Sequence, residues 1–391
     1  MGRPDDVILP PQTAFLSDPA ARAVLDAVQA GGHEILFVGG CVRNALLGLD
    51  AADVDMATSA APREVQLLAE AAGLRTVPTG IDHGTVTVIA GETPFEVTTY
   101  RRDVETDGRR AVVAFADTHA EDALRRDFTI NALYCDGAGK VLDPVGGLPD
   151  IDARRVRFIG DAAQRIAEDR LRMLRFFRFT AWYADPDGGL DPDGLAAVAA
   201  AAQDAAELSA ERVGAELLKL LLAPDPAPAL AGMQASGLGH VMLPGSDTDP
   251  MARLVHVEGL LGLAPAPLRR LAGLTPSADH LRLSRAQLKR FDLLRARIGD
   301  GTGAAELAYR DGPEVAWDVL ALRAALLEAE IPVDAASDIA AGASAEFPLR
   351  ASDLPQSGPA LGAALRVAEA AWIASNFTLS AEALIAQAQG R

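Results

Sequence analysis

The sequence is poor in cysteine and has no long apolar run. It contains 2 cysteines, Cys41 and Cys135, among 391 residues, which is too few for a disulfide framework and is typical of a reducing cytoplasm. No apolar run approaches the roughly 20 residues that cross a bilayer. The first residues carry acidic side chains instead of the apolar core of a signal peptide. We therefore expect a cytoplasmic protein with no membrane span.

Basic residues are outnumbered by acidic ones. There are 36 Lys and Arg residues against 54 Asp and Glu residues, for a net charge of −18 at pH 7. Taken alone, this balance argues against a nucleic-acid partner, because phosphate groups are bound by Lys and Arg. The arginines are nevertheless concentrated in short segments, at 101–102, 109–110, 125–126, 154–157 and 165–178. This distribution predicts an acidic surface with a basic cleft.

The first part of the chain predicts an α+β domain. Apolar periodicity indicates short helices and alternating segments indicate strands; the strands are expected at 35–38, 53–58, 84–90, 95–99, 129–135 and 140–143. The polar stretch 103–117 contains Gly108, so we expect a mobile loop there. These signals place an N-terminal domain over residues 1–155.

After residue 160 the strand signals stop. The pattern predicts one long helix over 162–183, followed by helices over 190–206 and 210–222. The segment 224–228 reads PDPAP and indicates a linker, and the remainder is rich in Ala and Leu. We therefore expect a helical neck over residues 156–223 and a helical body and tail over residues 224–391.

A Gly-Gly turn followed by a carboxylate pair is the most informative pattern. Gly39 and Gly40 come between an expected strand and a helical run, where backbone N–H groups can approach a triphosphate. Arg43 follows and can pair with phosphate oxygens. Asp53 and Asp55 are two positions apart, so on an extended strand they share a face with Cα atoms roughly 6.5–7 Å apart. Such a pair can bind two Mg²⁺ ions, and this combination indicates nucleotidyl transfer.

Glu96 is a further candidate metal ligand. It lies in the alternating segment 95–99 with Thr98 on the same face. A third carboxylate near the metal pair could hold a metal ion or a water molecule. A solvated strand face explains Glu96 equally well, and both interpretations stay open.

The segment RRDFTINA also carries charges suited to a nucleotide. Arg125 and Arg126 can neutralise phosphates, and Asp127 can accept a hydrogen bond from a ribose 2′-hydroxyl, which would separate NTP from dNTP. The alternative is a salt bridge at the entry of a strand, but adjacent residues have poor geometry for one. We favour the nucleotide contacts.

The helix expected over 162–183 offers a base-selecting pair. Asp169 and Arg172 are three positions apart and are therefore neighbours on a helix, and Arg175 and Arg178 continue the same stripe. Taken alone, Asp169 and Arg172 would be a surface ion pair that contributes roughly a few tenths of a kcal/mol to stability. However, a carboxylate beside a guanidinium matches the edges of cytosine and adenine, whereas O6 of guanine or O4 of uracil would face the carboxylate. Four apolar residues lie off this stripe and are expected in the core: Leu171, Leu174, Phe177 and Phe179.

Taken together, these segments resemble the class II tRNA nucleotidyltransferase/poly(A) polymerase family, most closely its bacterial CCA-adding members. The matching motifs are FVGGCVRNALLG with DVDMATS, FEVTTYRRD, RRDFTINAL, DPVGGLPDIDARRVRFIG, RIAEDRLRMLRFFRF and SAERVGAELLKLLL. They cover residues 36–221 in the order of the family. The resemblance implies a nucleotidyltransferase-fold head with a mixed sheet, followed by helical neck, body and tail domains.

The resemblance also implies a role for each matching position. It implies that Asp53 and Asp55 are the catalytic metal ligands and that Gly40 and Arg43 contact the triphosphate. It implies an NTP contact for Arg126 and a ribose contact for Asp127. Asp169 and Arg172 would be the amino-acid template for the base, and Arg175 and Arg178 would make further nucleotide contacts. Two positions depart from the family pattern. Asn44 stands where Asp is usual, which is expected to weaken a support of the turn, and Arg170 stands where a small residue is frequent, with no clear consequence.

The expected activity is Mg²⁺-dependent transfer of CMP and AMP from CTP and ATP to the 3′ end of tRNA. Residues after 224 are the expected tRNA-binding region, and no protein partner is evident. A poly(A) polymerase and a CC-only adding enzyme of the same family are alternatives. A catalytically silent RNA-binding homologue is another, but such a protein should have lost Asp53 and Asp55. A small-molecule nucleotidyltransferase is disfavoured by the length of helical chain after the head.

Overall fold

A computed structural model describes residues 7–49, 53–81, 84–106 and 111–388. The chain forms two compact units, which we describe separately. The first comprises the residues up to 220 together with 228–244, and the second comprises 221–227 and the residues from 245 onward. The boundaries expected after residues 155 and 223 remain predictions.

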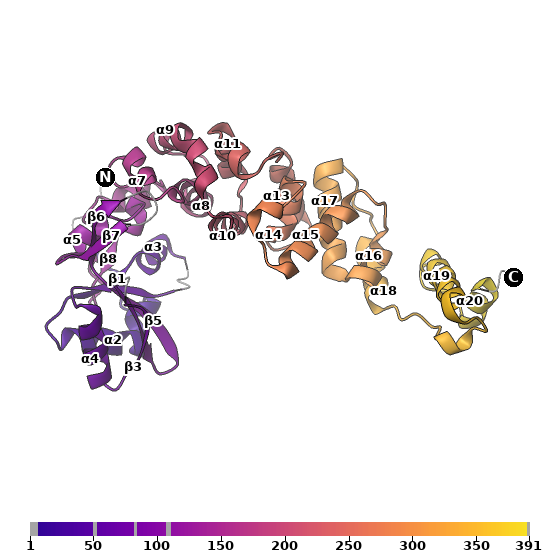
Figure 1. Cartoon of the computed structure of the whole chain (residues 1–391), viewed down its shortest axis with the longest axis horizontal. Coiled ribbons are helices and arrows are strands. Elements are labelled where there is room, and N and C mark those ends of the chain that lie inside the picture. Colours follow the sequence, from indigo (N-terminus) through magenta and orange to yellow (C-terminus); the bar gives the residue numbers. More distant parts are fainter. Residues whose placement is uncertain (1–6, 50–52, 82–83, 107–110, 389–391) are drawn as a thin grey trace. The chain divides into compact units, whose positions relative to one another are not determined.

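The first unit is built on a seven-stranded mixed sheet, part of which is labelled in Figure 1. The strand order is β3-β4-β5-β2-β1-β8-β9. Its strands are β1 Ile35–Val38, β2 Asp55–Thr58, β3 Arg75–Gly80, β4 Thr85–Ala90, β5 Thr93–Thr99, β8 Tyr134–Cys135 and β9 Val141–Leu142. Strands β2 and β5 are parallel, and the other neighbouring pairs are antiparallel. The head with a mixed sheet that the sequence predicted is confirmed.

Helices α2 (Pro19–Gln29) and α4 (Pro62–Ala71) pack against each other and against β4. Both carry proline in the first turn, where the missing N–H costs no hydrogen bond. The Asp18 side chain caps α2 by accepting a hydrogen bond from the backbone N–H of Ala20. Alternate residues of β4 are buried, so one face of the strand contributes to the core.

Two segments of the first unit differ from the sequence-based expectation. The expected loop over 103–117 contains parts of two paired strands, β6 (Arg101–Thr106) and β7 (Ala111–Phe115); residues 107–110 lie outside the described chain. The run AVVAF in β7 favours a strand through its β-branched and aromatic residues, and the polar composition of the neighbouring residues concealed this. The expected strand over 129–135 begins as a 3-10 turn, Thr129–Asn131, before β8.

The long helix expected over 162–183 is interrupted. Helix α7 spans Ala162–Glu168 and helix α8 spans Arg172–Tyr183. Between them Asp169 is extended, with φ −150° and ψ 105°. Its Oδ1 accepts a hydrogen bond from the backbone N–H of Leu171 over 3.1 Å. An aspartate that binds the backbone two residues ahead favours a turn over a continuous helix, which explains the break.

An aromatic cluster joins helix α8 to the head. Phe128 and Phe158 lie 4.9 Å apart between ring centroids, and the ring of Phe176 lies 5.5 Å from that of Phe158. Phe128 also contacts Phe179 at 5.2 Å. All four side chains are buried, so this cluster fixes α8 against the segment that leads into β8.

Further helices of the chain follow α8. They are α9 Pro192–Ala201, α10 Ala210–Leu221, α11 Ala227–Ala235 and α12 Leu238–Met242. Helix α10 is amphipathic: Val213, Leu217 and Leu220 form a buried stripe. Every strand that the structure describes ends before residue 143, so the helical region that the sequence predicted is confirmed.

The second unit is helical and contains a buried cluster of charges. Its longer helices are α13 Pro250–Leu260, α14 Pro267–Leu274, α15 Arg285–Ile298, α16 Ala304–Asp311, α17 Pro313–Leu327, α18 Ala335–Ser344, α19 Gly358–Ala374 and α20 Ala381–Ala388. Arg269 pairs with both Glu258 and Asp318, at 2.8 and 2.7 Å, and Arg270 pairs with Glu258 at 2.7 Å. In the described part of the chain, no helix combines the length and apolar character needed to cross a bilayer.

Candidate functional site

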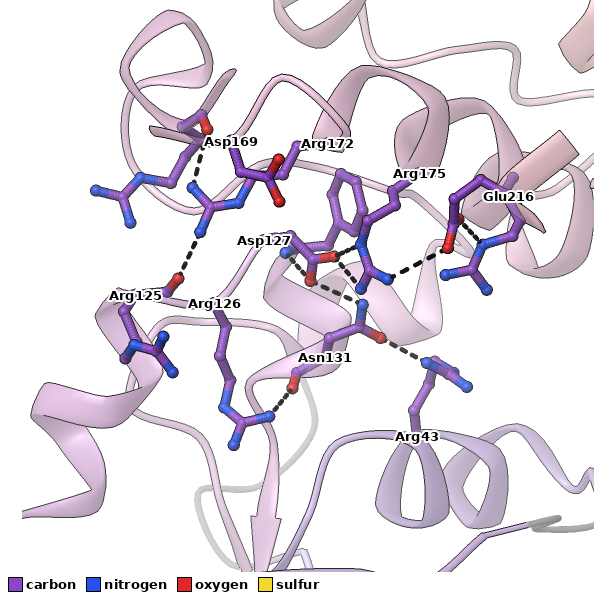
Figure 2. Close-up of polar contacts among 12 residues, drawn as sticks. Arg43, Arg125, Arg126, Asp127, Asn131, Asp169, Arg172, Arg175 and Glu216 are labelled. Atoms are coloured by element: carbon purple, nitrogen blue, oxygen red, sulfur yellow. Dashed lines mark hydrogen bonds and ion pairs between the residues drawn. The ribbon is translucent and has the colours of Figure 1, made fainter. Parts of the chain in front are cut away.

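Most of the residues that the sequence singled out, though not Glu96, line one cavity of the first unit. Figure 2 shows the polar contacts that several of them make. The cavity has a volume of about 560 Å³. Its lining includes Gly39, Gly40, Arg43, Asp53, Asp55, Arg126, Asp127, Asp169, Arg172, Arg175 and Arg178. The sequence assigned no site role to Asn131 and Lys219, which also line it. Basic side chains outnumber carboxylates in this lining, so the cavity is the basic cleft expected in an acidic chain.

The Gly-Gly turn brings a helix N-terminus to the cavity. Gly39 follows β1 and adopts φ 72°, ψ −117°, a conformation that side chains disfavour. An added Cβ would lie 3.4 Å from Nη1 of Arg126 and 3.6 Å from the Asn131 carbonyl oxygen. Helix α3 (Gly40–Leu47) begins at the next residue. Its free backbone N–H groups therefore lie beside the cavity, where they can bind an anion.

Arg43 is held by uncharged partners. Its Nη1 donates to Asn131 Oδ1 over 2.5 Å, its Nε and Nη2 both donate to Asn44 Oδ1, and Nη2 donates to the Tyr183 hydroxyl over 2.8 Å. The guanidinium carbon lies 3.9 Å from the centroid of the Tyr183 ring. Burial lowers the pKa of Arg43. Among the described residues no carboxylate ion-pairs with Arg43, so its charge is oriented without being neutralised.

The Asn44 amide therefore supports Arg43 despite replacing the usual aspartate. Its Oδ1 accepts two hydrogen bonds from the guanidinium, at 3.1 and 2.9 Å. The weaker support of the turn that the sequence predicted stays a prediction. An amide supplies the same acceptor geometry as a carboxylate oxygen but no negative charge.

Three carboxylates lie on or next to the paired strands β2 and β5. Asp55 begins β2 and is paired in parallel register with Glu96 of β5. Partial desolvation, together with the charges of Glu96 and Asp53, raises the pKa of Asp55, and Arg126 opposes this change. Clustered carboxylates of this kind favour a hard cation that takes oxygen ligands.

Within the described chain, no group of three metal-binding side chains is close enough to form a complete site. Asp53 and Asp55 also line an adjoining cavity of about 560 Å³, which Glu96 lines as well. The arrangement suits a cation held by one or two carboxylates and completed by substrate oxygens. It does not decide whether Glu96 is a ligand.

Arg126 is anchored by a buried carboxylate that the sequence analysis did not identify. Asp122 of α5 (His119–Leu124) pairs with Arg126 at 2.9 Å and accepts a hydrogen bond from the Tyr134 hydroxyl over 2.8 Å. Burial alone would raise the pKa of Asp122, but Arg126 and Tyr134 hold it below its ordinary value. The four-residue spacing of Asp122 and Arg126 was a signal for this pair.

Asp127 is buried and makes three hydrogen bonds and one further ion-pair contact. Its Oδ1 accepts from the Phe128 backbone N–H over 2.8 Å and from Asn131 Nδ2 over 3.0 Å. Its Oδ2 accepts from Nε of Arg175 over 2.7 Å, and Nη2 of Arg175 lies 2.5 Å from the same oxygen. A carboxylate has about four acceptor positions. The ribose contact expected for Asp127 remains a prediction, and it requires that one of these bonds be exchanged.

Glu216 is a second buried carboxylate without a role in the sequence analysis. It lies on α10 and accepts a hydrogen bond from Nε of Arg178 over 2.6 Å, and it lies 4.0 Å from Nη1 of Arg175. The sequence did contain a signal for this role. Glu216 lies within the apolar stripe of α10, and a carboxylate on a buried helix face is almost always paired with a cation. Glu216 thus orients two of the arginines that line the cavity (Figure 2).

Asp169 and Arg172 line the same cavity but do not form the helical neighbour pair that the sequence predicted. Arg172 Nη1 donates to Glu168 over 2.5 Å and to the Arg165 carbonyl oxygen over 2.8 Å, and its Nη2 donates to the Arg125 carbonyl oxygen over 2.8 Å. Asp169 ion-pairs instead with Arg212 of α10 at 2.8 Å. The predicted pair does not form because the extended backbone at Asp169 ends α7, so that Asp169 and Arg172 are not on one continuous helix.

Phe179 has a role beyond the core. The residues predicted as core, Leu171, Leu174, Phe177 and Phe179, are all buried. Phe179 also lines the cavity, where the guanidinium carbon of Arg178 lies 4.3 Å from its ring centroid and that of Arg175 lies 5.1 Å away. Its ring therefore provides an aromatic surface for two arginines.

Cys41 is a buried filler of the core. Its side chain is 1% exposed, and burial raises its pKa to about 11. A thiol with a raised pKa is a poor nucleophile at neutral pH.

Comparison with known proteins identifies two domain families in this chain. The family of the "Poly A polymerase head domain" matches residues 35–157, and the family described as "Probable RNA and SrmB- binding site of polymerase A" matches residues 189–249. The CCA tRNA nucleotidyltransferase 1, mitochondrial, of Homo sapiens is 39% identical over 213 residues, which cover 54% of this chain and 49% of that protein. The CCA-adding enzyme of Levilactobacillus brevis is 42% identical over 220 residues, or 56% of this chain and 54% of that protein. The chain thus spans about half the length of these two curated relatives.

A solved structure matches over nearly the whole length. The crystal structure of the Bacillus stearothermophilus CCA-adding enzyme in complex with CTP aligns with a TM-score of 0.73 and 26% sequence identity. The alignment covers 96% of this chain and 98% of that one. The fold, a mixed-sheet head followed in the chain by a helical region, is therefore shared with that enzyme.

Proposed function

We propose that this chain, whose residues 35–157 match the family of the poly(A) polymerase head domain, adds CMP and AMP from CTP and ATP to the 3′ end of tRNA without a nucleic-acid template. In each step the 3′-oxygen of the tRNA forms a bond to the α-phosphorus and pyrophosphate leaves. One observation carries the proposal. A single cavity is lined by the Asp53/Asp55 carboxylates, the N-terminus of α3 with Arg43, and the side chains of Asp169 and Arg172.

The phosphate groups would bind at the head side of this cavity. The free backbone N–H groups in the first turn of α3, which begins at Gly40, and the un-neutralised charge of Arg43 offer donors to the triphosphate. Arg126 adds a second guanidinium, held in place by Asp122. These contacts are common to all nucleotides and would not distinguish the bases.

Asp53 and Asp55 would hold divalent metal. We propose Mg²⁺, because the donor set consists of oxygen atoms and leaves positions for substrate oxygens. When bound, such ions lower the pKa of an attacking hydroxyl and neutralise charge on the leaving group. The carboxylates themselves lie open to solvent, so the site can load without rearrangement of the core. Glu96 would be a metal or water ligand from the neighbouring strand.

Asp169 and Arg172 would read the base. The exocyclic amino groups of cytosine and adenine can donate to the Asp169 carboxylate, and their ring nitrogens can accept from Arg172. Guanine and uracil present a carbonyl oxygen to Asp169 instead. Because Arg172 already donates to Glu168 and to two backbone carbonyls, its guanidinium is fixed before any nucleotide binds.

We also propose a division of labour along the chain. Residues 1–155 would carry catalysis, residues 156–223 the base-selecting neck, and residues 224–391 the contacts to tRNA. A cytoplasmic location is part of this proposal and is supported by the scarcity of cysteine.

The test is incubation with a tRNA that ends at the discriminator base and with each labelled NTP in turn, then with CTP and ATP together. We expect two C additions with CTP alone, one further A when ATP is present, and no addition from UTP or GTP. A ladder of A residues without C would indicate a poly(A) polymerase. An arrest after two C residues in the presence of ATP would indicate a CC-only enzyme, and no addition would indicate a silent homologue.

A further inference from the structure

Helix α10 (Ala210–Leu221) contacts both kinds of charge at the cavity. Arg212 and Glu216 lie four positions apart, hence on the same face of the helix. Arg212 contacts the Asp169 carboxylate, and Glu216 contacts Arg178 and Arg175. The positive side chain of Arg212 therefore contacts the carboxylate that would read the base, and the negative side chain of Glu216 contacts two arginines of the same cavity.

The contact of Arg212 with Asp169 involves both carboxylate oxygens. Nη2 of Arg212 lies 3.1 Å from Oδ1 and 2.8 Å from Oδ2. The backbone N–H of Leu171 donates to Oδ1 as well, over 3.1 Å. With three of about four acceptor positions in use, Asp169 keeps one acceptor position, on Oδ2. Asp127, with three hydrogen bonds and a further ion-pair contact to Nη2 of Arg175, is more fully engaged.

Asp169 has little else to fix its side chain. It lies in the extended segment between α7 and α8 and is 37% exposed. Arg172 is committed to Glu168 and does not pair with Asp169. Arg212, from 43 residues further along the chain, is thus the cation that sets the orientation of this carboxylate.

We propose that Arg212 is a positioning residue for base selection: it holds Asp169 so that the remaining acceptor position on Oδ2 meets the exocyclic amino group of cytosine or adenine. This inference rests on the proposed function. Arg212 would touch Asp169 and not the nucleotide, since it is absent from the cavity lining.

A merely structural role can be separated from this one. Arg212 is 48% exposed, and exposed ion pairs contribute little to stability. Replacing it should therefore shift the Tm by no more than about 2 °C. Selection among bases should change much more, because an unaligned carboxylate no longer distinguishes an amino group from a carbonyl oxygen.

The experiment compares R212M, which keeps the length and removes the charge, with R212K, which keeps the charge. The matched control is R170M, because Arg170 is also a partly exposed arginine next to Asp169, pairs with Glu207 at 3.1 Å and does not line the cavity. The full chain is titrated with CTP, ATP, UTP and GTP in the presence of Mg²⁺ by calorimetry. In parallel, kcat and KM are measured on tRNA that lacks CCA.

For R212M we expect the preference for CTP over UTP to fall roughly tenfold, mainly through a higher KM for CTP. R212K should stay within about threefold of the wild type, because one nitrogen bridges both oxygens and an ammonium group can replace it. R170M should match the wild type. In a D169A background, R212M should add no further loss of preference, since a residue that acts through another is not additive with it.

Several results would overturn the inference. It would be overturned if R212M kept the wild-type preference among bases, or if R212K lost as much of that preference as R212M. It would also be overturned if R212M lowered the preference further in the D169A background. An increase in CTP use by R212M would mean that the contact blocks the site. The proposed function fails separately: a wild type that prefers CTP and ATP in binding but adds nothing to tRNA would refute that function, and the calorimetric comparison would still test Arg212. A wild type that binds all four NTPs equally would refute base reading by Asp169 and this inference with it.

Discussion

Arg175 of α8 pairs with Asp127 of the head across 48 residues of sequence, with Nε 2.7 Å from Oδ2. The carboxylate is 7% exposed and the guanidinium 30% exposed. Both residues line the cavity, and their contact links two elements that carry nucleotide-binding candidates. Its loss should therefore affect both stability and activity.

Replacing Arg175 by Met should destabilise the protein by about 3 kcal/mol at pH 7, because it leaves a buried carboxylate without its cation. Burial alone would raise the pKa of Asp127, and Arg175 and Asn131 hold it below the ordinary value. The wild-type pair therefore contributes stability above the unfolded pKa of about 3.9 and loses it as the pH falls through the lower folded pKa.

In R175M the effect of burial is no longer opposed by Arg175, so the folded pKa of Asp127 should exceed the unfolded value. The variant then gains stability relative to the wild type as the pH falls, and the difference in Tm should be largest near pH 7 and narrow toward pH 4.5. Thermal unfolding across this range measures it. R155M is the control. Arg155 pairs with the buried carboxylate of Asp150, but Asp150 keeps a second cation, Arg157, at 2.9 Å, so this carboxylate is not left without a partner. A difference for R175M that is constant with pH would contradict this account of Asp127.

Replacing Asp53 or Asp55 by Asn should abolish nucleotide transfer without unfolding the chain. Both carboxylates are exposed, and an amide is a much weaker ligand for a hard cation. D55N should also keep or raise the Tm in metal-free buffer, because the pKa of Asp55 is raised by desolvation, Glu96 and Asp53. Transfer rates and thermal unfolding are the measurements. Activity within tenfold of the wild type in either variant would exclude the metal role.

Replacing Asn44 by Ala should raise KM for CTP and ATP together, by roughly fivefold, because Arg43 loses an acceptor of two hydrogen bonds. The base preference should stay unchanged, since Arg43 would contact phosphates. Tyr183→Phe, which keeps the ring beneath the guanidinium, should have a smaller effect, and Asn44→Asp should retain near-normal KM values. Steady-state kinetics with all four NTPs checks this. A change confined to one nucleotide would place Arg43 near the base instead.

The affinity for tRNA should fall steeply with salt despite the net charge of −18. Arginines that bind phosphates release condensed counterions, and the slope of log K against log[salt] is about −0.7 to −0.9 for each phosphate contact. We expect a slope of about −2 or steeper, measured by fluorescence anisotropy of labelled tRNA between 50 and 300 mM KCl, roughly the range in which counterion release is resolved. A flat plot would argue that RNA is not the partner.

Local chemistry was readable from the sequence. The turn at Gly39 and Gly40, the arginine after it and the Asp53/Asp55 pair lie within about twenty residues, and each signal depends on backbone geometry over a few positions. The mixed α+β head and the helical region after it follow from hydrophobic periodicity in the same way. Errors occurred where a side chain competed with the backbone, as at Asp169, or where strand residues were hidden in a polar stretch, as at 103–117.

The sequence by itself determined which chemical groups this protein brings to its cavity, because residue types and short spacings are written in it. The tertiary structure alone decided which of those groups are free to act. Arg43 is surrounded by neutral acceptors and keeps its charge, whereas Asp127 is engaged by hydrogen bonds and by an ion pair with Arg175. Asp169 is paired with Arg212 and not with Arg172. Ion pairs and desolvation depend on distances between atoms of remote segments, and only the packing of α8 and α10 against the head sets those distances.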